Sequence, residues 1–229
     1  MPAAAPTPEA VTGQRGEQTR RLIVDTAVRL FRDHGYEKTT MRAIAQEAGL
    51  SVGNAYYYFP SKDHLVQSFY SYLQQEHALA AAPALAGISE FADRLHAVLR
   101  TGVDTMRPHH ALAGKFIKVA ADPGSPLSPF SAESAPAREQ SLALFREVVA
   151  GTTTKIHPDV RADLPELLWL LHLGVTVFWV HDRSPGQAKT TLLVDRIVPL
   201  VDRLVSLSSM RVLRPVTREI LAVYRAVRS

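Results

Sequence analysis

The sequence contains no cysteine among its 229 residues. Disulfide bonds and thiolate metal sites are therefore excluded, and a reducing cytoplasm is the environment that we expect for the protein. Long hydrophobic runs are also scarce, because the most apolar stretch, 164–180, is interrupted by Glu166 and His172. A membrane-spanning helix needs about 20 apolar residues, so we interpret this stretch as a buried helix.

The N-terminal segment lacks both a basic start and an apolar run. Residues 1–12 are rich in Ala and Pro, which is unlike a secretory signal peptide. We therefore expect a disordered leader, which we extend to residues 1–15.

A strong excess of one charge is missing as well. The net charge is +4 and the pI is 9.5, which permits nucleic-acid binding without establishing it. Residues 1–62 hold eight Lys/Arg and six Asp/Glu, and the remainder holds eighteen and sixteen, so both parts carry +2. Any case for DNA binding must therefore rest on the sequence pattern.

Apolar residues recur at helical spacing along nearly the whole chain, and no segment alternates convincingly like a strand. A first helix buries the face formed by Ile23, Ala27, Leu30 and Phe31, and Gly35 provides its stop signal. The fold class that we expect is therefore all-α.

Two short helices follow, separated by a turn that contains glycine. Thr40 can cap the first, which ends near Gly49, and Ser51 can cap the second, which Pro60 stops. Two helices joined in this way form a helix-turn-helix. A longer helix starts near Lys62 and extends to residue 81.

The rest of the chain is predicted to be helical with two interruptions. We interpret residues 82–89 as a linker and the proline-rich segment 122–136 as a loop that can be mobile. The expected helices lie near 89–106, 111–121, 137–150, 163–182, 187–208 and 215–227.

Residues 35–65 read GYEKTTMRAIAQEAGLSVGNAYYYFPSKDHL. This segment resembles the DNA-binding domain of TetR-family transcriptional regulators nearly position by position, from the Gly-aromatic start through the paired Thr to the aromatic-rich recognition helix. The resemblance covers residues 17–67. It implies a helix-turn-helix domain over residues 16–67, with its last helix continuing to 82, and an effector-binding and dimerisation domain over residues 83–229.

The helix that starts at Ser51 can direct backbone N–H groups at a phosphate and its early positions at base edges in the major groove. The Asn54 amide can form hydrogen bonds with the edge of an adenine, and the Arg42 guanidinium can donate two hydrogen bonds to a guanine. The tyrosine hydroxyls suit phosphates, as do the residues that start the flanking helices. The DNA-binding residues that we expect, and to which the resemblance assigns contact, are Thr40, Arg42, Ser51, Val52, Gly53, Asn54, Tyr56, Tyr57 and Lys62.

Several of these residues also have a simpler interpretation. Arg42 and Lys62 can be solvated surface charges, and the two capping residues cap their helices whether or not DNA is bound. Only one or two of the three consecutive tyrosines can point outward, so Tyr58 and Phe59 are expected to pack inside the small domain.

The resemblance implies a homodimer formed through the helices 163–182 and 187–208. The second of these carries a wide apolar stripe, formed by Leu192, Leu193, Ile197, Leu200, Val201 and Leu204. The first is apolar nearly all round, which favours burial on every side, with a pocket on one side and a partner on the other. A plain core helix gives the same pattern.

A ligand pocket is expected to be mostly apolar with a few polar groups. Few charged residues occur in these helices, so we expect a small, mainly hydrophobic effector. A buried histidine is more often a core residue than a ligand contact, and the pair His109-His110 is poorly placed to chelate a metal. The candidate ligand-binding residues are His96, Leu99, Val103, Met106, Phe116, Trp169, His172, Leu173 and Phe178.

The function that follows is a DNA-binding transcriptional regulator, a repressor released from a palindromic operator by its effector. A DNA-binding regulator without a small-molecule effector is the alternative. An enzyme is not expected, because the sequence has no Gly-x-Ser-x-Gly, no phosphate-binding glycine loop and no thiol. No cofactor or metal is expected.

Overall fold

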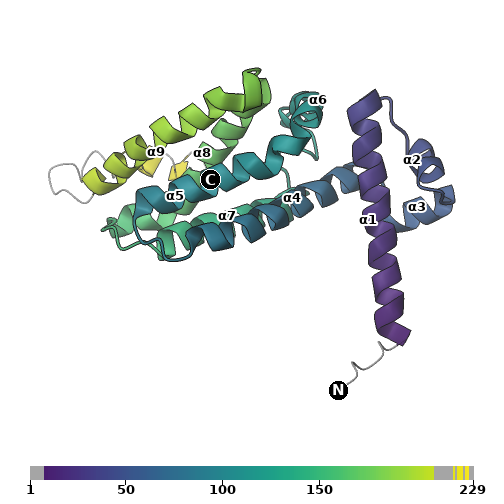
Figure 1. Cartoon of the computed structure of the whole chain (residues 1–229), viewed down its shortest axis with the longest axis horizontal. Helices are drawn as coiled ribbons and strands as arrows, with labels where there is room; N and C mark the ends of the chain where they lie inside the picture. The colour runs from purple at the N-terminus through teal and green to yellow at the C-terminus, as the bar shows by residue number, and fades with distance from the viewer. Residues whose placement is uncertain (1–7, 209–218, 220, 224, 227–229) are drawn as a thin grey trace. The chain divides into compact units, whose positions relative to one another are not determined.

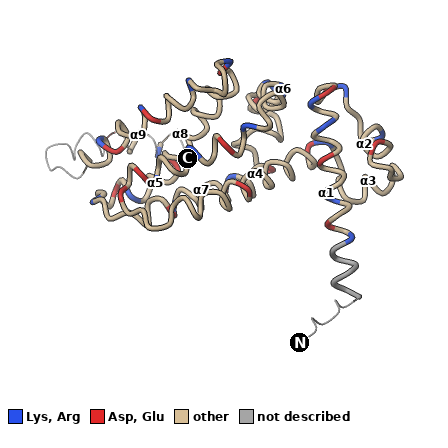
Figure 2. The backbone as a smooth tube through the Cα atoms, viewed as in Figure 1, with Lys and Arg blue, Asp and Glu red and all other residues tan. Residues whose placement is uncertain are grey.

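The computed structural model describes residues 8–208, 219, 221–223 and 225–226. Every regular element among these residues is a helix (Figure 1), which confirms the expected all-α class. Residues 1–7 of the expected leader and most of the expected helix 215–227 lie outside this part of the chain. Lys/Arg and Asp/Glu are interspersed along the backbone (Figure 2), as the even charge balance of the sequence suggests.

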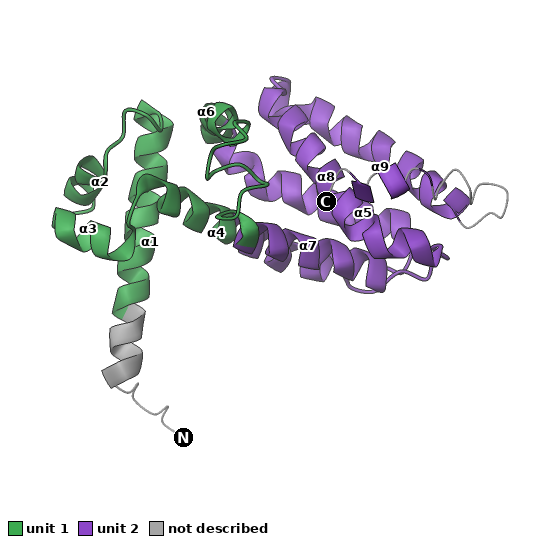
Figure 3. Cartoon of the chain, turned by 180° about the vertical axis from the view of Figure 1, so that it is seen from behind, with its two compact units in different colours: residues 1–72, 111–135 green, residues 73–110, 136–229 purple. Residues whose placement is uncertain are grey.

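The chain divides into two compact units (Figure 3). Unit 1 comprises residues 1–72 and 111–135, and unit 2 comprises residues 73–110 and 136–229. This division differs from the expected boundary at 82–83. Helix α4, Lys62–Leu85, continues through Pro83, because the alanine-rich run before that proline strongly favours helix. The chain first turns at Gly87, whose φ is +75°.

Unit 1 begins with the long helix α1, Pro8–His34. Residues 8–15 are therefore helical, although we expected them to belong to the leader. The short helices α2, Met41–Glu47, and α3, Val52–Tyr58, follow, and α2 packs both on α1 and on α3. The buried apolar core comprises Ile23, Ala27, Leu30, Phe31, Met41, Ile44, Ala45, Ala55, Phe59, Leu65, Val66 and Phe69.

Two glycines make the turns of this small domain possible. Gly35 ends α1 with a φ of +87°, and Gly49 lies between α2 and α3 with a φ of +68°. A side chain in this left-handed region is strained, whereas glycine adopts it freely. Both expected helix stops are therefore confirmed, and the turn between α2 and α3 has the tight geometry of a helix-turn-helix.

Unit 1 is completed by helix α6, His110–Ala120, and the segment that follows it. Phe116 of α6 packs against Phe31 and Tyr36, with ring centroids 5.6 Å from each. The proline-rich segment is held by α4, since Gln67 Nε2 donates to the Pro126 carbonyl at 2.6 Å and to Ser134 Oγ at 2.9 Å. The loop that we expected to be mobile is therefore held to α4 by hydrogen bonds.

Unit 2 is built around helix α5, Phe91–Met106, and helix α8, Pro158–His181. Both contact helix α9, Ala188–Ser208, and helix α7, Ala135–Ala150, adds a further buried face. Short 3₁₀ turns lie at Arg107–His109 and Pro185–Gln187. By length and composition α8 could cross a membrane, but here it buries Leu168, Trp169 and Trp179, as a core helix does.

Candidate DNA-binding site

Helix α3 presents one face to solvent and buries the other. Ala55 is fully buried and Phe59, directly after the helix, is 1% exposed. These two residues fix the rotation of α3, so that Tyr56 is 49% and Tyr57 82% exposed. Two neighbouring exposed tyrosines suit a binding surface, because each offers an apolar ring and a polar hydroxyl. The outward Tyr56 and Tyr57 and the inward Phe59 agree with the sequence-based prediction, whereas Tyr58, which was also expected inside, is half-buried.

Both helices of the motif are capped by the residues predicted to cap them. Thr40 Oγ1 accepts from the Ala43 N–H at 3.1 Å, and Ser51 Oγ accepts from the Asn54 N–H at 3.1 Å. These bonds satisfy backbone donors that each helix would otherwise leave unpaired. The predicted DNA-binding residues other than Lys62 all have exposed side chains or, for glycine, an exposed backbone: Thr40, Arg42, Ser51, Val52, Gly53, Asn54, Tyr56 and Tyr57.

Lys62 is half-buried and already has a partner inside unit 1. Its Nζ donates to the Tyr36 carbonyl at 2.8 Å and lies 4.3 Å from the centre of the Tyr36 ring. The Tyr36 hydroxyl in turn donates to Asp63. These contacts tie the start of α4 to the loop between α1 and α2. Lys62 is therefore first a positioning residue, whose ammonium keeps two further N–H donors for a phosphate.

Tyr36 is a residue of this site that the sequence reasoning did not single out. Burial, followed by the bond to Asp63, raises the pKa of the Tyr36 phenol well above its usual value. The hydroxyl therefore stays protonated and keeps donating. Its place in the Gly-aromatic start of the motif was a signal, but the partner Asp63 lies 27 positions later in the chain.

The outer sides of α1 support α2 and α3 through charged groups. Arg29 pairs with Glu47 at 2.7 Å between exposed side chains, and the Arg20 guanidinium lies 4.7 Å from the centre of the Phe59 ring. Exposed pairs of this kind contribute little stability individually. They add contacts between α1 and the ends of the two short helices, while buried Ala55 and Phe59 fix the outward face of α3.

Comparison of the sequence with known protein families identifies the relatives of this chain. Residues 23–69 match the family described as bacterial regulatory proteins, tetR family, and residues 94–220, more than half of the chain, match the family described as tetracyclin repressor-like, C-terminal domain. The chain belongs to the TetR family. Regulators of the TetR family are DNA-binding proteins and not enzymes.

Individual relatives agree with the TetR assignment. The transcriptional repressor KstR of Rhodococcus jostii is 44% identical over 52 residues, which are 23% of this chain and 24% of KstR. The chain spans only 19% to 30% of the length of the first curated relatives that it matches.

Solved structures of TetR regulators extend the likeness to most of the chain. The regulator from Nitrosomonas europaea is 20% identical and superposes with a TM-score of 0.61 over 80% of this chain and 97% of its own. The fatty acid degradation regulator FadR from Bacillus halodurans is 15% identical, with a TM-score of 0.60 over 79% and 94%. At these identities the likeness shows the TetR fold alone.

The predicted ligand-binding residues do not all come together. Phe116 lies in unit 1, in the aromatic cluster with Phe31 and Tyr36. His96 is bonded to Asp195 at 2.8 Å, and Phe178 is 42% exposed. Helical periodicity placed all three on plausible inner faces, but contacts with distant residues decide their actual environment. Those that remain buried or half-buried in unit 2 are Leu99, Val103, Met106, Trp169, His172 and Leu173.

His172 forms the polar centre of this group, together with His77, which the sequence reasoning did not include. The two rings stack with centroids 5.7 Å apart. They lie over Gly102, where an added Cβ would come within 2.9 Å of His77 and 3.1 Å of His172. His77 Nε2 is bonded to the Val98 carbonyl at 2.9 Å, whereas His172 Nδ1 is buried with no hydrogen-bond partner among the described residues.

Burial favours the neutral form of both histidines. Burial, and then the proximity of His77, lowers the pKa of His172 to about 3, and burial lowers the pKa of His77. The neutral imidazole of His172 can therefore donate or accept one hydrogen bond with a polar group through Nδ1. His110, which was not among the candidate ligand-binding residues, has its Nε2 bonded to the Trp179 carbonyl at 2.8 Å.

Helices α8 and α9 expose a set of apolar side chains. Helix α9 buries Val194, Val198 and Val205 on one face and turns leucines outward on the other. The stripe predicted on this helix is therefore largely its solvent face, and the valines missed by the prediction form its core face. The exposed apolar residues of the two helices are Val177, Phe178, Leu192, Leu200, Leu204 and Leu207, each 41% to 59% exposed.

Proposed function

We propose that this TetR-family chain is a ligand-responsive transcriptional regulator, acting as a repressor that leaves a palindromic operator when a small, mainly hydrophobic effector binds. The observation that carries the proposal is the outward face of α3. Buried Ala55 and Phe59 force Tyr56 and Tyr57 into solvent, on a helix that is capped, short and free along its outer side. Such a helix can enter the major groove.

The roles of the individual residues follow from their chemistry. Asn54 can pair with an adenine edge and Arg42 with a guanine, while Val52 and Gly53 select by shape. Tyr56 and Tyr57 contact phosphates or thymine methyl groups. Thr40, Ser51 and the free N–H donors of Lys62 supply phosphate contacts that set the register on the duplex.

The exposed apolar side chains of α8 and α9 are proposed to form the dimer interface. Side chains such as Leu200 and Leu204, at 50% and 59% exposure, gain stability when a second copy removes them from water. Two-fold symmetry then pairs two copies of α3, which fits a palindromic operator in the cytoplasm.

The effector is proposed to bind among the buried apolar side chains of unit 2, with His172 as its polar contact. Leu99, Val103 and Trp169 supply apolar surface, and the free Nδ1 of His172 is available to one polar group. The ligand releases DNA only if it binds the released conformation more tightly than the DNA-bound one. Its body is therefore apolar, with a single hydrogen-bonding group.

DNA binding is tested by fluorescence anisotropy at low salt, on labelled DNA fragments from the region upstream of the gene that encodes this chain. Asn54→Ala is expected to weaken binding by about 10-fold and to relax preference at one base position. Gln75→Ala, at an exposed position outside the motif, is the control and should bind like the parent. Equal loss of affinity in both variants, or no binding to any fragment, would overturn the proposal.

Effector response is tested on the same complex with long-chain fatty acids, sterols, sugars and amino acids. Release by an apolar compound, abolished in His172→Phe with DNA binding retained, is the expected result. Operator binding that no compound of the panel changes would favour a regulator that works without a small hydrophobic effector.

A further inference from the structure

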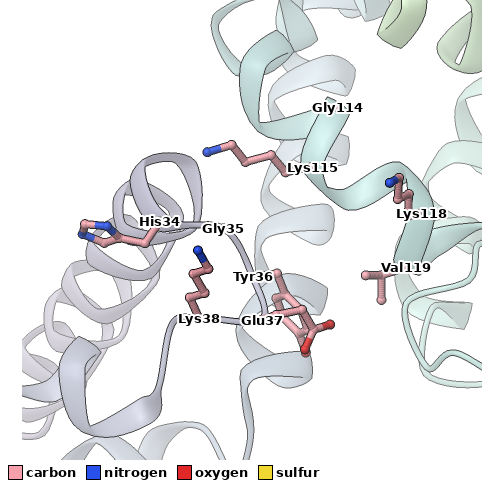
Figure 4. A pocket seen from close by; sticks show the side chains of 9 residues that line it. All are labelled: His34, Gly35, Tyr36, Glu37, Lys38, Gly114, Lys115, Lys118 and Val119. Atoms are coloured by element: carbon pink, nitrogen blue, oxygen red, sulfur yellow. The ribbon is translucent and has the colours of Figure 1, made fainter.

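Unit 1 contains a pocket in which every lining residue except Tyr36 lies outside the proposed DNA-binding and effector sites. Its volume is about 350 Å³, and it lies between the end of α1, the loop that leads to α2, and α6 (Figure 4). The lining residues are His34, Gly35, Tyr36, Glu37, Lys38, Gly114, Lys115, Lys118 and Val119. Its volume lies near the lower end of the range for small-molecule sites.

The lining of this pocket is basic. Three lysines and one glutamate give it a net charge of +2 while His34 is neutral. Figure 4 shows Lys38 rising from the loop and Lys115 reaching from α6. Like charges gathered around a concave surface repel one another, and a bound anion relieves that repulsion.

Two of these ammonium groups are free. Lys115 Nζ donates to the Arg32 carbonyl at the end of α1, which fixes that side chain in place. Lys38 and Lys118 form no ion pair or hydrogen bond with any residue in the described part of the chain. Each therefore has three donors available to a ligand.

Gly114 keeps the pocket open on the α6 side. An added Cβ at this position would meet nothing within 4 Å, so packing does not require a glycine. A glycine inside a helix costs up to about 1 kcal/mol relative to alanine. Its presence beside the three lysines is explained if a ligand approaches the backbone of α6 here.

We propose that this pocket is a second ligand site, which binds a small phosphate-bearing anion between α6 and the loop that precedes α2. Phosphate oxygens match the free donors of Lys38 and Lys118, and the negative charge of a phosphate group complements the positive lining. Because the same ligand would contact the loop and α6, binding stabilises the small domain that carries α2 and α3.

The test uses the full chain without DNA and pyrophosphate as the probe, with inorganic phosphate and citrate as comparison anions at matched ionic strength. Isothermal titration should show saturable pyrophosphate binding. Lys38→Gln and Lys118→Gln should each raise the Kd by about 5-fold, and the double variant by more than about 10-fold. Lys155→Gln, an exposed lysine of unit 2, should leave the Kd unchanged.

Two further variants separate this site from the DNA-binding face. Arg42→Gln, on α2, should leave pyrophosphate binding unchanged, and Gly114→Leu should weaken it while circular dichroism shows an intact fold. Citrate binding as tightly as pyrophosphate would overturn the preference for phosphate. Unchanged affinity in the double lysine variant, or pyrophosphate binding lost in Arg42→Gln, would overturn the site itself.

Discussion

The guanidinium of Arg94 lies directly against the backbone of Gly151. Arg94 is only 6% exposed, yet it pairs with no carboxylate in the part of the chain that the structure describes. Its nitrogens donate instead to the carbonyls of Ile88, Glu147 and Val148 at 2.7, 2.9 and 3.1 Å. The last two belong to the C-terminal turn of α7, where free carbonyls and the helix dipole favour a cation.

Gly151→Ala is expected to destabilise the protein by about 1–3 kcal/mol. An added Cβ would lie 2.3 Å from Arg94 Nη2, so the guanidinium would have to leave its carbonyl partners. Urea denaturation followed by circular dichroism measures the change. Gly114→Ala is the matched control, since its Cβ meets nothing and a helical alanine should be neutral or stabilising. Equal stability of the two variants would contradict the packing of Arg94.

The stability of the protein is expected to fall as the pH drops below 6.5. The pKa of His172 is lowered to about 3 in the folded protein by burial and by His77, whereas an unfolded histidine titrates near its ordinary value. Between these values the unfolded chain binds a proton that the folded chain does not. Each such histidine therefore removes up to about 1.4 kcal/mol of unfolding free energy per pH unit.

Urea denaturation at several pH values between 7 and 4 tests this dependence. In His172→Phe the unfolding free energy should change less steeply with pH, by the contribution of about one proton. His64→Gln, at an exposed position, should retain the parental slope. A parental slope in His172→Phe would show that the burial of this ring does not govern the acid sensitivity.

Asp182→Asn is expected to loosen the turn between α8 and α9. The Asp182 carboxylate accepts from the N–H and hydroxyl of Ser184 at 2.9 and 2.6 Å, and from those of Thr190 at 2.8 and 2.7 Å. Burial alone would raise its pKa, but these four bonds hold the pKa well below the usual value. The stability that they provide is present above the pKa of an unfolded Asp and is lost as the pH falls.

The loss in Asp182→Asn should be about 2–3 kcal/mol at neutral pH, because an amide nitrogen cannot accept the bonds that one carboxylate oxygen receives. Thermal unfolding measures it, with Asp25→Asn at an exposed site of α1 as the reference. A melting temperature equal to that of the reference would mean that the carboxylate charge is not needed in this turn.

The exposed leucines of α9 are expected to be essential for dimer formation. Leu200→Glu combined with Leu204→Glu places two charges in the proposed interface and should give a monomer by light scattering, with helicity retained. Leu79→Glu, on α4 at a position that is 70% exposed, should leave the dimer intact. A double variant that remains dimeric would place the interface elsewhere.

Much of the small domain could be predicted from the sequence. The caps Thr40 and Ser51, the turn glycine Gly49 and the inward Phe59 are local signals, because each acts on residues a few positions away. The outward face of α3 follows from them. The environments of Lys62 and Phe116 could not be predicted in the same way, since their partner Tyr36 is 26 or more positions distant in sequence.

The sequence by itself determined the helical class, the helix-turn-helix and most helix ends, since backbone capping and a 3.6-residue apolar repeat are set by neighbouring residues. Only the tertiary structure decided that α6 joins unit 1, that His77 stacks on His172 over Gly102, and that three lysines share one pocket. Contacts of this kind depend on how separate helices pack, and helical periodicity gives the face of a helix without naming the residues that it meets.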